Sequence, residues 1–261
     1  MSSPQPKSGQ WVARPAVREH PELRLFCFPY AGGTTDRFSS WSSAIDPTIE
    51  LALVQLPGRA GRFREPHITC MESMVDRLSE ALKPYFDLPF SFFGHSMGAL
   101  IAYELAQLLE GSRRGPERVF ASGCPAPQRL KPDRCVGAME DAELTGFLTA
   151  MGGTPPNVLQ NPELLQLVLP SIRSDFRLVE GYGFRPRPPL RTPLSLAFGS
   201  EDPETKPEDI ILWGELSSGG CETRWFEGNH FFLHAQSRQV AEWISVTTLT
   251  QIRLSMPYKE S

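Results

Sequence analysis

The sequence lacks a run of 18 apolar residues, the length that a membrane-spanning helix requires. Its first ten residues, Met1 to Gln10, have no apolar core of the signal-peptide type. The five cysteines include no Cys-x-x-Cys pair, and their odd number indicates free thiols in a reducing compartment. We therefore expect no membrane span and predict a cytoplasmic location. We expect no metal site and no cofactor.

The sequence also lacks an excess of positive charge, because 26 lysines and arginines face 30 aspartates and glutamates. Nucleic-acid and membrane-surface partners favour a strongly basic chain, so we expect neither. No internal repeat is present. The length of 261 residues and the hydrophobic content of 40% suffice for one large α/β domain with a buried core.

Short apolar runs of strand type alternate with segments of helical spacing along most of the chain. The expected strands cover residues 23–28, 50–55, 90–93, 118–122, 193–198 and 223–226. The expected helices cover residues 71–82, 100–109, 208–216 and 237–254. Such alternation predicts a mostly parallel central sheet with helices on both faces, within residues 21–261. Residues 1–20 are polar and proline-bearing, and we interpret them as a loosely held N-terminal arm.

The alternation stops between about residues 130 and 187, where no convincing strand occurs. Helical spacing indicates three helices there, at residues 144–151, 164–169 and 172–179, with Pro170 marking a boundary or a kink. A structureless loop of this length is uncommon in a compact domain. We therefore predict a helical insertion that folds over the strand ends as a lid. The alternative is that these helices only enlarge the core.

A Gly-x-Ser-x-Gly pentapeptide at residues 94–98 separates an apolar strand from a helical pattern. The pentapeptide alone occurs by chance in many proteins, but this order of strand, sharp turn and helix is typical of a nucleophile elbow. The turn would leave the Ser96 hydroxyl exposed at the end of the strand. A serine nucleophile also needs a base, an acid that orients the base, and donors for the oxyanion.

Asp202 and His230 each follow an expected strand, and the order Ser96, Asp202, His230 is that of α/β-hydrolase triads. Functional groups of open α/β sheets gather at the carboxyl ends of strands. We predict that His230 takes the Ser96 proton while Asp202 orients the imidazole, and that an acyl-enzyme forms. Weaker alternatives are His234 for the base, and Glu201, Asp175 and Asp209 for the acid.

The loop after the first expected strand contains Gly32 and Gly33, which allow a backbone N–H to turn into a cleft. A plain tight turn would look the same. Beside a nucleophile elbow we favour an oxyanion hole, formed by the backbone amide of Met97 and by one from Tyr30 or Ala31.

The loop after the second expected strand is basic and contains Arg59, Arg62 and Arg64. These arginines could meet a phosphate or an acidic partner. We interpret them as solvated surface charge, which is the more common situation for such a cluster.

With these residues in view, the chain resembles the type II thioesterases that accompany polyketide and nonribosomal peptide synthases. It also resembles the medium-chain acyl thioesterase of animal fatty-acid synthesis. The matching segments, in chain order, are residues 28–33, 56–59, 92–99, 152–155, 199–202 and 230–233. One departure is Asn229, where the family usually has glycine before the histidine.

The resemblance implies an α/β-hydrolase fold with a mobile lid, and a monomer. It implies hydrolysis of acyl groups held as thioesters on the phosphopantetheine arm of acyl or peptidyl carrier proteins, which removes stalled or wrongly loaded groups. Such an arm needs a narrow channel between lid and sheet. From periodicity we place Phe147, Met151 and Leu165 along it. The alternatives are a carboxylesterase or lipase of the same fold, and a non-catalytic synthase-binding protein.

Overall fold

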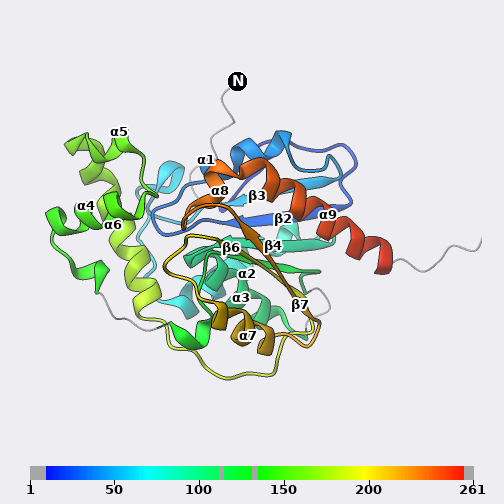
Figure 1. The fold of residues 1–261 in the computed structure, drawn as a ribbon. Helices are drawn as coiled ribbons and strands as arrows, with labels where there is room; N and C mark the ends of the chain where they lie inside the picture. Colours follow the sequence, from blue (N-terminus) through cyan, green and yellow to red (C-terminus); the bar gives the residue numbers. More distant parts are fainter. Residues whose placement is uncertain (1–9, 112–114, 131–134, 256–261) are drawn as a thin grey trace, which may run out of the picture.

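The computed structural model describes residues 10–111, 115–130 and 135–255. Within these residues seven strands form one sheet in the order β1-β3-β2-β4-β5-β6-β7 (Figure 1). The strands are β1 (Val12–Ala13), β2 (Leu23–Phe28), β3 (Ile49–Val54), β4 (Phe90–His95), β5 (Val119–Ser122), β6 (Leu194–Gly199) and β7 (Cys221–Phe226). All neighbours pair in parallel except β1 and β3. The predicted mostly parallel α/β architecture is confirmed.

The central strands are buried on both faces because helices cover both sides of the sheet. Along β2, Phe26 and Phe28 enter one core cluster, whereas Leu25 and Cys27 enter the other. This alternation follows from the two-residue period of a strand, and it explains why the run is apolar throughout. The predicted strands are therefore confirmed, with bounds that shift by at most two residues.

One face of the sheet carries α2 (Met71–Leu82), α3 (Met97–Leu109) and α7 (Pro207–Glu215). The other face carries α1 (Asp36–Ser39), α8 (Phe232–Ala235) and α9 (Ser237–Ser255), with a short 3₁₀ segment after α1 (Figure 1). Helices α2, α3, α7 and α9 overlap the four expected helices, with bounds that shift by at most three residues. The two faces thus present separate cores on either side of one sheet.

Strand β1 lies inside the stretch that we interpreted as a loose arm. Val12 and Ala13 pair antiparallel with Val54 and Leu53 of β3, and both residues of β1 are buried. The interpretation is therefore wrong for this part of the arm, whereas residues 1–9 lie outside the described residues. Two residues are too short for a periodic signal, so only the pairing with β3 defines this strand.

The segment between β5 and β6 contains three α-helices among its described residues: α4 (Asp141–Met151), α5 (Pro156–Leu159) and α6 (Pro162–Glu180). We call this segment the lid. It projects from one end of the sheet (Figure 1) and has a core cluster of its own, which includes Leu144, Leu148 and Ile172. The predicted helical insertion is confirmed.

The predicted division of the lid at Pro170 is wrong. The second and third expected helices are one helix of 19 residues, α6, with Pro170 inside it. A proline in a helix interior costs about 3 kcal/mol, because it removes one hydrogen bond and crowds the preceding turn. Burial of Leu169 and Ile172 on either side of Pro170 offsets that cost, and the Asn161 side chain caps the helix start.

Because the lid has a separate core, we predict different effects for two fully buried leucines. Leu196→Ala in β6 should lower the global free energy of unfolding by about 2–5 kcal/mol. Leu144→Ala in α4 should lower it less, and should instead accelerate amide hydrogen exchange in α4. Urea unfolding and hydrogen exchange measure the two effects. Equal losses of global stability, with no change of exchange in α4, would contradict the independence of the lid core.

Candidate active site

Ser96 occupies a strained turn between β4 and α3, with φ 54° and ψ −120°. The turn is possible only because its two glycines carry no side chain. A Cβ on Gly94 would lie 2.0 Å from the Gly98 carbonyl oxygen, and a Cβ on Gly98 would lie 2.2 Å from the Phe28 carbonyl oxygen. Between residues 90 and 103, Ser96 alone is partly exposed. The sequence therefore folds locally into an elbow that presents one hydroxyl to the solvent side.

Asp202 and His230 lie in the loops that follow β6 and β7, which are neighbouring parallel strands. The His230 Nδ1 atom lies 2.9 Å from Asp202 Oδ2, and both residues are buried. The other oxygen, Oδ1, accepts a hydrogen bond from the Glu204 amide at 3.0 Å. An ionised carboxylate accepts only, so it selects the tautomer with the proton on Nδ1 and leaves Nε2 as a base.

Ser96 and His230 line the same cavity, which has a volume of about 380 Å³. Among the described residues the Ser96 hydroxyl has no hydrogen-bond partner, and in structures without substrate such contacts are often long. About half of the lining surface is apolar, and the lining comes from both the core and the lid. The apolar residues include Met97, Leu100, Leu130, Val136, Phe147, Met151, Phe176 and Val179.

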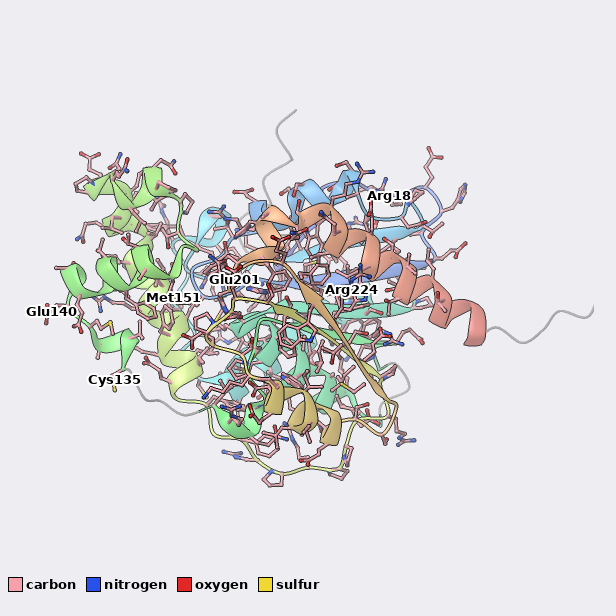
Figure 2. The ribbon with its side chains drawn as sticks, viewed as in Figure 1. Arg18, Cys135, Glu140, Met151, Glu201 and Arg224 are labelled. Carbon is pink, nitrogen blue, oxygen red and sulfur yellow. The ribbon has the colours of Figure 1, made fainter. Side chains whose placement is uncertain are left out.

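Two of the three predicted lid residues, Phe147 and Met151, line this cavity. Met151 lies on the side of the lid nearer the core, whereas Cys135 and Glu140 lie at its outer side (Figure 2). Leu165 is not part of the lining and packs against the lid core instead. The C-terminal half of α6 also contributes Phe176 and Val179 to the lining, which was not predicted. The sequence shows the apolar stripe of this segment but not that the stripe faces the cavity.

The loop after β2 lies against the elbow, because Gly98 packs on the Phe28 carbonyl. It continues into a turn in which the Gly33 amide donates to the Tyr30 carbonyl at 2.8 Å. Met97 is the first residue of α3, and the amides of a first helical turn have no acceptor within the helix. The amides of Met97, Tyr30 and Ala31 thus belong to two adjacent backbone segments beside Ser96.

The alternative acids and the alternative base have other partners. His234 Nε2 lies 3.1 Å from the Tyr30 hydroxyl, and Glu201 is exposed. Asp209 accepts from the amides of Ala126 and Lys206. Asp175 pairs with Arg59. Of the carboxylates of Glu201, Asp175, Asp209 and Asp202, only that of Asp202 accepts a hydrogen bond from the His230 ring among the described residues.

The interpretation of Arg59 and Arg62 as solvated surface charge is wrong, whereas Arg64 is exposed as expected. Arg59 is 6% exposed and Arg62 is 3% exposed. Arg62 binds both carboxylate oxygens of Glu65, at 2.9 and 2.6 Å, and also donates to a backbone carbonyl. A carboxylate that accepts two hydrogen bonds from one guanidinium group compensates the arginine for its loss of hydration. The arginine cluster in the sequence does not reveal this pairing.

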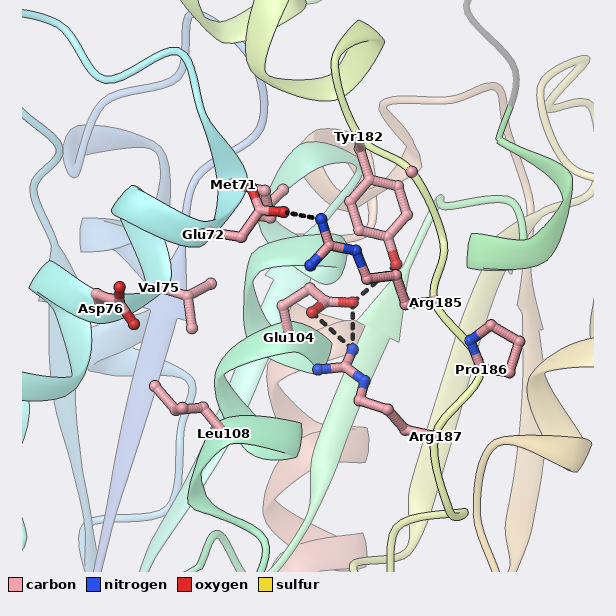
Figure 3. Close-up of a pocket in the computed structure, with 11 residues that line it drawn as sticks. Met71, Glu72, Val75, Asp76, Glu104, Leu108, Tyr182, Arg185, Pro186 and Arg187 are labelled. Atoms are coloured by element: carbon pink, nitrogen blue, oxygen red, sulfur yellow. Dashed lines mark hydrogen bonds and ion pairs between the residues drawn. The ribbon is translucent and has the colours of Figure 1, made fainter.

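Another sizeable cavity, of about 400 Å³, lies between α2, α3 and the segment after α6 (Figure 3). Its charged groups, apart from Asp76, are paired with one another. Glu104 accepts from Arg187 and from the Tyr182 hydroxyl, and Glu72 pairs with Arg185. Burial, together with the nearby Glu104 carboxylate, raises the pKa of Tyr182. The residues that line this cavity include no serine, cysteine or histidine.

Within the described residues, no helix combines the length and apolarity needed to cross a membrane. The same part of the chain contains no group of three or more histidine, cysteine, aspartate or glutamate side chains placed to hold a metal ion.

The parallel sheet, the serine elbow at a strand end and the helical lid define an α/β-hydrolase fold. Residues 23–247 match the model of the thioesterase domain family, so the chain belongs to this family, and it is a thioester hydrolase. The chain is 36% identical over 241 residues to "Thioesterase PikA5" of Streptomyces venezuelae, a match that covers 91% of this chain and 85% of the relative.

Solved structures support the same assignment. The type II thioesterase BorB from the borrelidin biosynthetic cluster is 31% identical, with a TM-score of 0.85 over 92% of this chain and 98% of that chain. YbtT, a type II thioesterase from the yersiniabactin NRPS/PKS biosynthetic pathway, is 30% identical, with a TM-score of 0.80 over 90% of this chain and 96% of that chain. The resemblance to type II thioesterases is confirmed.

Three histidines with lowered pKa values predict how the stability of the fold depends on pH. Burial lowers the pKa values of His95, His67 and His234, and for His95 the nearby His230 lowers the pKa further. A lowered pKa means that the folded state holds these rings neutral, whereas the unfolded chain protonates them below about pH 6.5. The unfolded state then binds more protons, so stability should fall as the pH falls below this value.

Urea unfolding at pH 7.5 and pH 5.5 measures this effect. The fully buried His95 alone contributes a slope of at most about 1.4 kcal/mol per pH unit. His95→Gln should therefore flatten the pH dependence, whatever it does to stability at pH 7.5. A wild-type protein that is equally stable, or more stable, at pH 5.5 would contradict the prediction.

Proposed function

We propose that this thioesterase hydrolyses acyl groups held on the phosphopantetheine thiol of acyl or peptidyl carrier protein domains. In this role it removes stalled or misprimed groups from polyketide or nonribosomal peptide assembly lines. The observation that carries the proposal is the cavity that joins Ser96 and His230 to the apolar faces of α4 and α6. An apolar acyl chain fits such a lining, and the names of the related proteins point to the same kind of pathway.

In the proposed mechanism Ser96 is the nucleophile, His230 the general base and Asp202 the orienting acid. His230 Nε2 takes the hydroxyl proton as Ser96 Oγ attacks the thioester carbonyl, and Asp202 stabilises the imidazolium. The proton then passes to the leaving thiolate. Water, activated by the same imidazole, attacks the acyl-enzyme, so the acid is released and the serine is restored.

The backbone amide of Met97 and one amide from Tyr30 or Ala31 receive the oxyanion in this proposal. Each donor of this kind is typically worth about 2.7–4 kcal/mol of transition-state stabilisation. A thioester suits such a site, because its carbonyl is less stabilised by resonance than that of an oxygen ester and because a thiolate leaves readily.

Burial of Arg59 and Arg62 leaves Arg64 as the one member of this arginine cluster that can contact an acidic carrier protein. The cavity lining adds Arg129 and the exposed Lys206, beside Glu180 and Glu204. A carrier that docks at this end of the molecule would present its phosphopantetheine arm to the cavity.

Hydrolysis of a panel of acyl carrier proteins, loaded with short, medium and branched chains, tests the proposal. Carrier thioesters should turn over much faster than oxygen esters with the same acyl group. Ser96→Ala should lower kcat by about 10⁴- to 10⁶-fold, because the nucleophile is lost. A fluorophosphonate should add to Ser96 in the wild type, as read by mass spectrometry.

Each unfavourable outcome identifies a different alternative. Equal or faster turnover of oxygen esters would indicate a carboxylesterase or lipase. The absence of turnover and of a fluorophosphonate adduct would indicate a non-catalytic synthase-binding protein. An adduct that persists in Ser96→Ala would place the nucleophile elsewhere.

The lid lining predicts acyl-chain preference. Met151→Trp adds bulk inside the cavity and should shift the preference toward shorter chains, as measured by kcat/KM across the carrier panel. Leu167→Trp is a matched control, because Leu167 lies on α6 with 51% of its surface exposed and does not line the cavity. An unchanged preference in Met151→Trp, or an equal shift in both variants, would count against this cavity as the acyl site.

A further inference from the structure

Asp175 is a lid residue that reaches into the loop after β2. It lies on α6 and is 1% exposed. Its Oδ2 atom accepts a hydrogen bond from the Gly32 amide at 2.7 Å and another from Arg59 at 2.7 Å, and its Oδ1 atom accepts from Arg59 at 2.6 Å. Arg59 also donates to the Gly33 carbonyl at 3.3 Å. One buried ion pair therefore contacts both glycines of the loop.

A second residue of α6 confines the same loop by contact. Gly32 has φ 74°, and a Cβ at this position would lie 2.7 Å from Cγ1 of Ile172. Ile172 and Asp175 are three residues apart, so they lie on one face of the helix. The lid helix thus holds Gly32 both by van der Waals contact and by a charge-assisted hydrogen bond.

The loop is confined from its other side by the elbow helix. Gly98 of α3 lies so close to the Phe28 carbonyl that a Cβ would not fit between them. The turn from Tyr30 to Gly33 is closed by the hydrogen bond from the Gly33 amide to the Tyr30 carbonyl. Because the turn is fixed at both ends, the orientation of its amides depends on where α6 holds Gly32. The amides of this turn include those of Tyr30 and Ala31, one of which would donate to the oxyanion in the proposed mechanism.

We propose that Asp175 is a positioning residue that couples the lid to the oxyanion hole. Its hydrogen bond sets the orientation of the Tyr30–Gly33 turn when α6 is docked on the core. Arg59 neutralises the carboxylate, because a bare negative charge beside the turn would oppose the charge that develops on the oxyanion. This inference rests on the proposed function, since it concerns the same reaction at the same serine.

Replacement of Asp175 tests the coupling on the full-length protein with one carrier-bound acyl thioester. Asp175→Ala removes the acceptor of the Gly32 amide and should lower kcat by about 100-fold with little change in KM, since small misplacements of catalytic groups cost that much. Asp175→Asn keeps an oxygen for Gly32 and should recover part of kcat, although it loses the charge. Glu65→Gln is the matched control, because it removes the charge of the carboxylate that pairs with the neighbouring buried Arg62.

A tetrahedral inhibitor separates positioning from general destabilisation. An alkyl boronic acid bonded to Ser96 places an oxygen where the oxyanion forms, so its Ki should rise in step with the loss of kcat/KM across the variants. Inhibition by the fatty-acid product, which forms no tetrahedral centre, should stay constant. Thermal unfolding shows that each variant is folded at the assay temperature.

The outcomes are distinct. Asp175 variants that keep the wild-type kcat, or a loss of kcat in Glu65→Gln equal to that in Asp175→Ala, would overturn the positioning role. If Asp175→Ala does not fold, Gly32→Ala decides, because its Cβ would push against Ile172 and should lower kcat. Adding Ile172→Ala should restore only part of kcat, because an alanine at φ 74° stays strained whatever space is made. A wild-type protein without thioester turnover, or one unaffected by Ser96→Ala, would instead overturn the proposed function.

Discussion

The structure depends on the close contact between Gly98 at the start of α3 and the Phe28 carbonyl at the end of β2. A Cβ at Gly98 would lie 2.2 Å from that oxygen, so no other residue permits this approach without a shift of backbone. The contact brings the elbow that presents Ser96 against the loop that begins with Tyr30. Two segments far apart in the sequence therefore share one site.

The parallel sheet brings the other two groups of the site, Asp202 and His230, close together. Parallel strands end at one edge, so the loops after β6 and β7 carry Asp202 and His230 to adjacent positions. Burial of this pair strengthens its hydrogen bond, since the effective dielectric constant is lower than in water. The lid closes the apolar side of the site. The lid has a hydrophobic core of its own, while α6 is attached to the rest of the domain through buried polar contacts.

Much of the fold followed from local patterns. Apolar runs of four to six residues indicate the strands, and helical spacing indicates α2 and α9, because both signals lie within a short window. The predictions that were wrong share a physical cause. β1 is two residues long and exists only through its pairing with β3. α6 runs through Pro170 because packing on both sides outweighs the local penalty. Arg59 is buried because Asp175, more than a hundred residues away, compensates its charge.

By itself the sequence determined the order of elements, the elbow at Ser96 and the residues proposed as its acid and base, since each depends on neighbours in the chain. The tertiary structure decided which lid residues face the cavity, with Phe147 and Met151 lining it and Leu165 packed in the lid core. It also decided that two of the three arginines are internal. The direction of a helix face and the partner of a buried charge are set by contacts between distant segments, which no local pattern encodes.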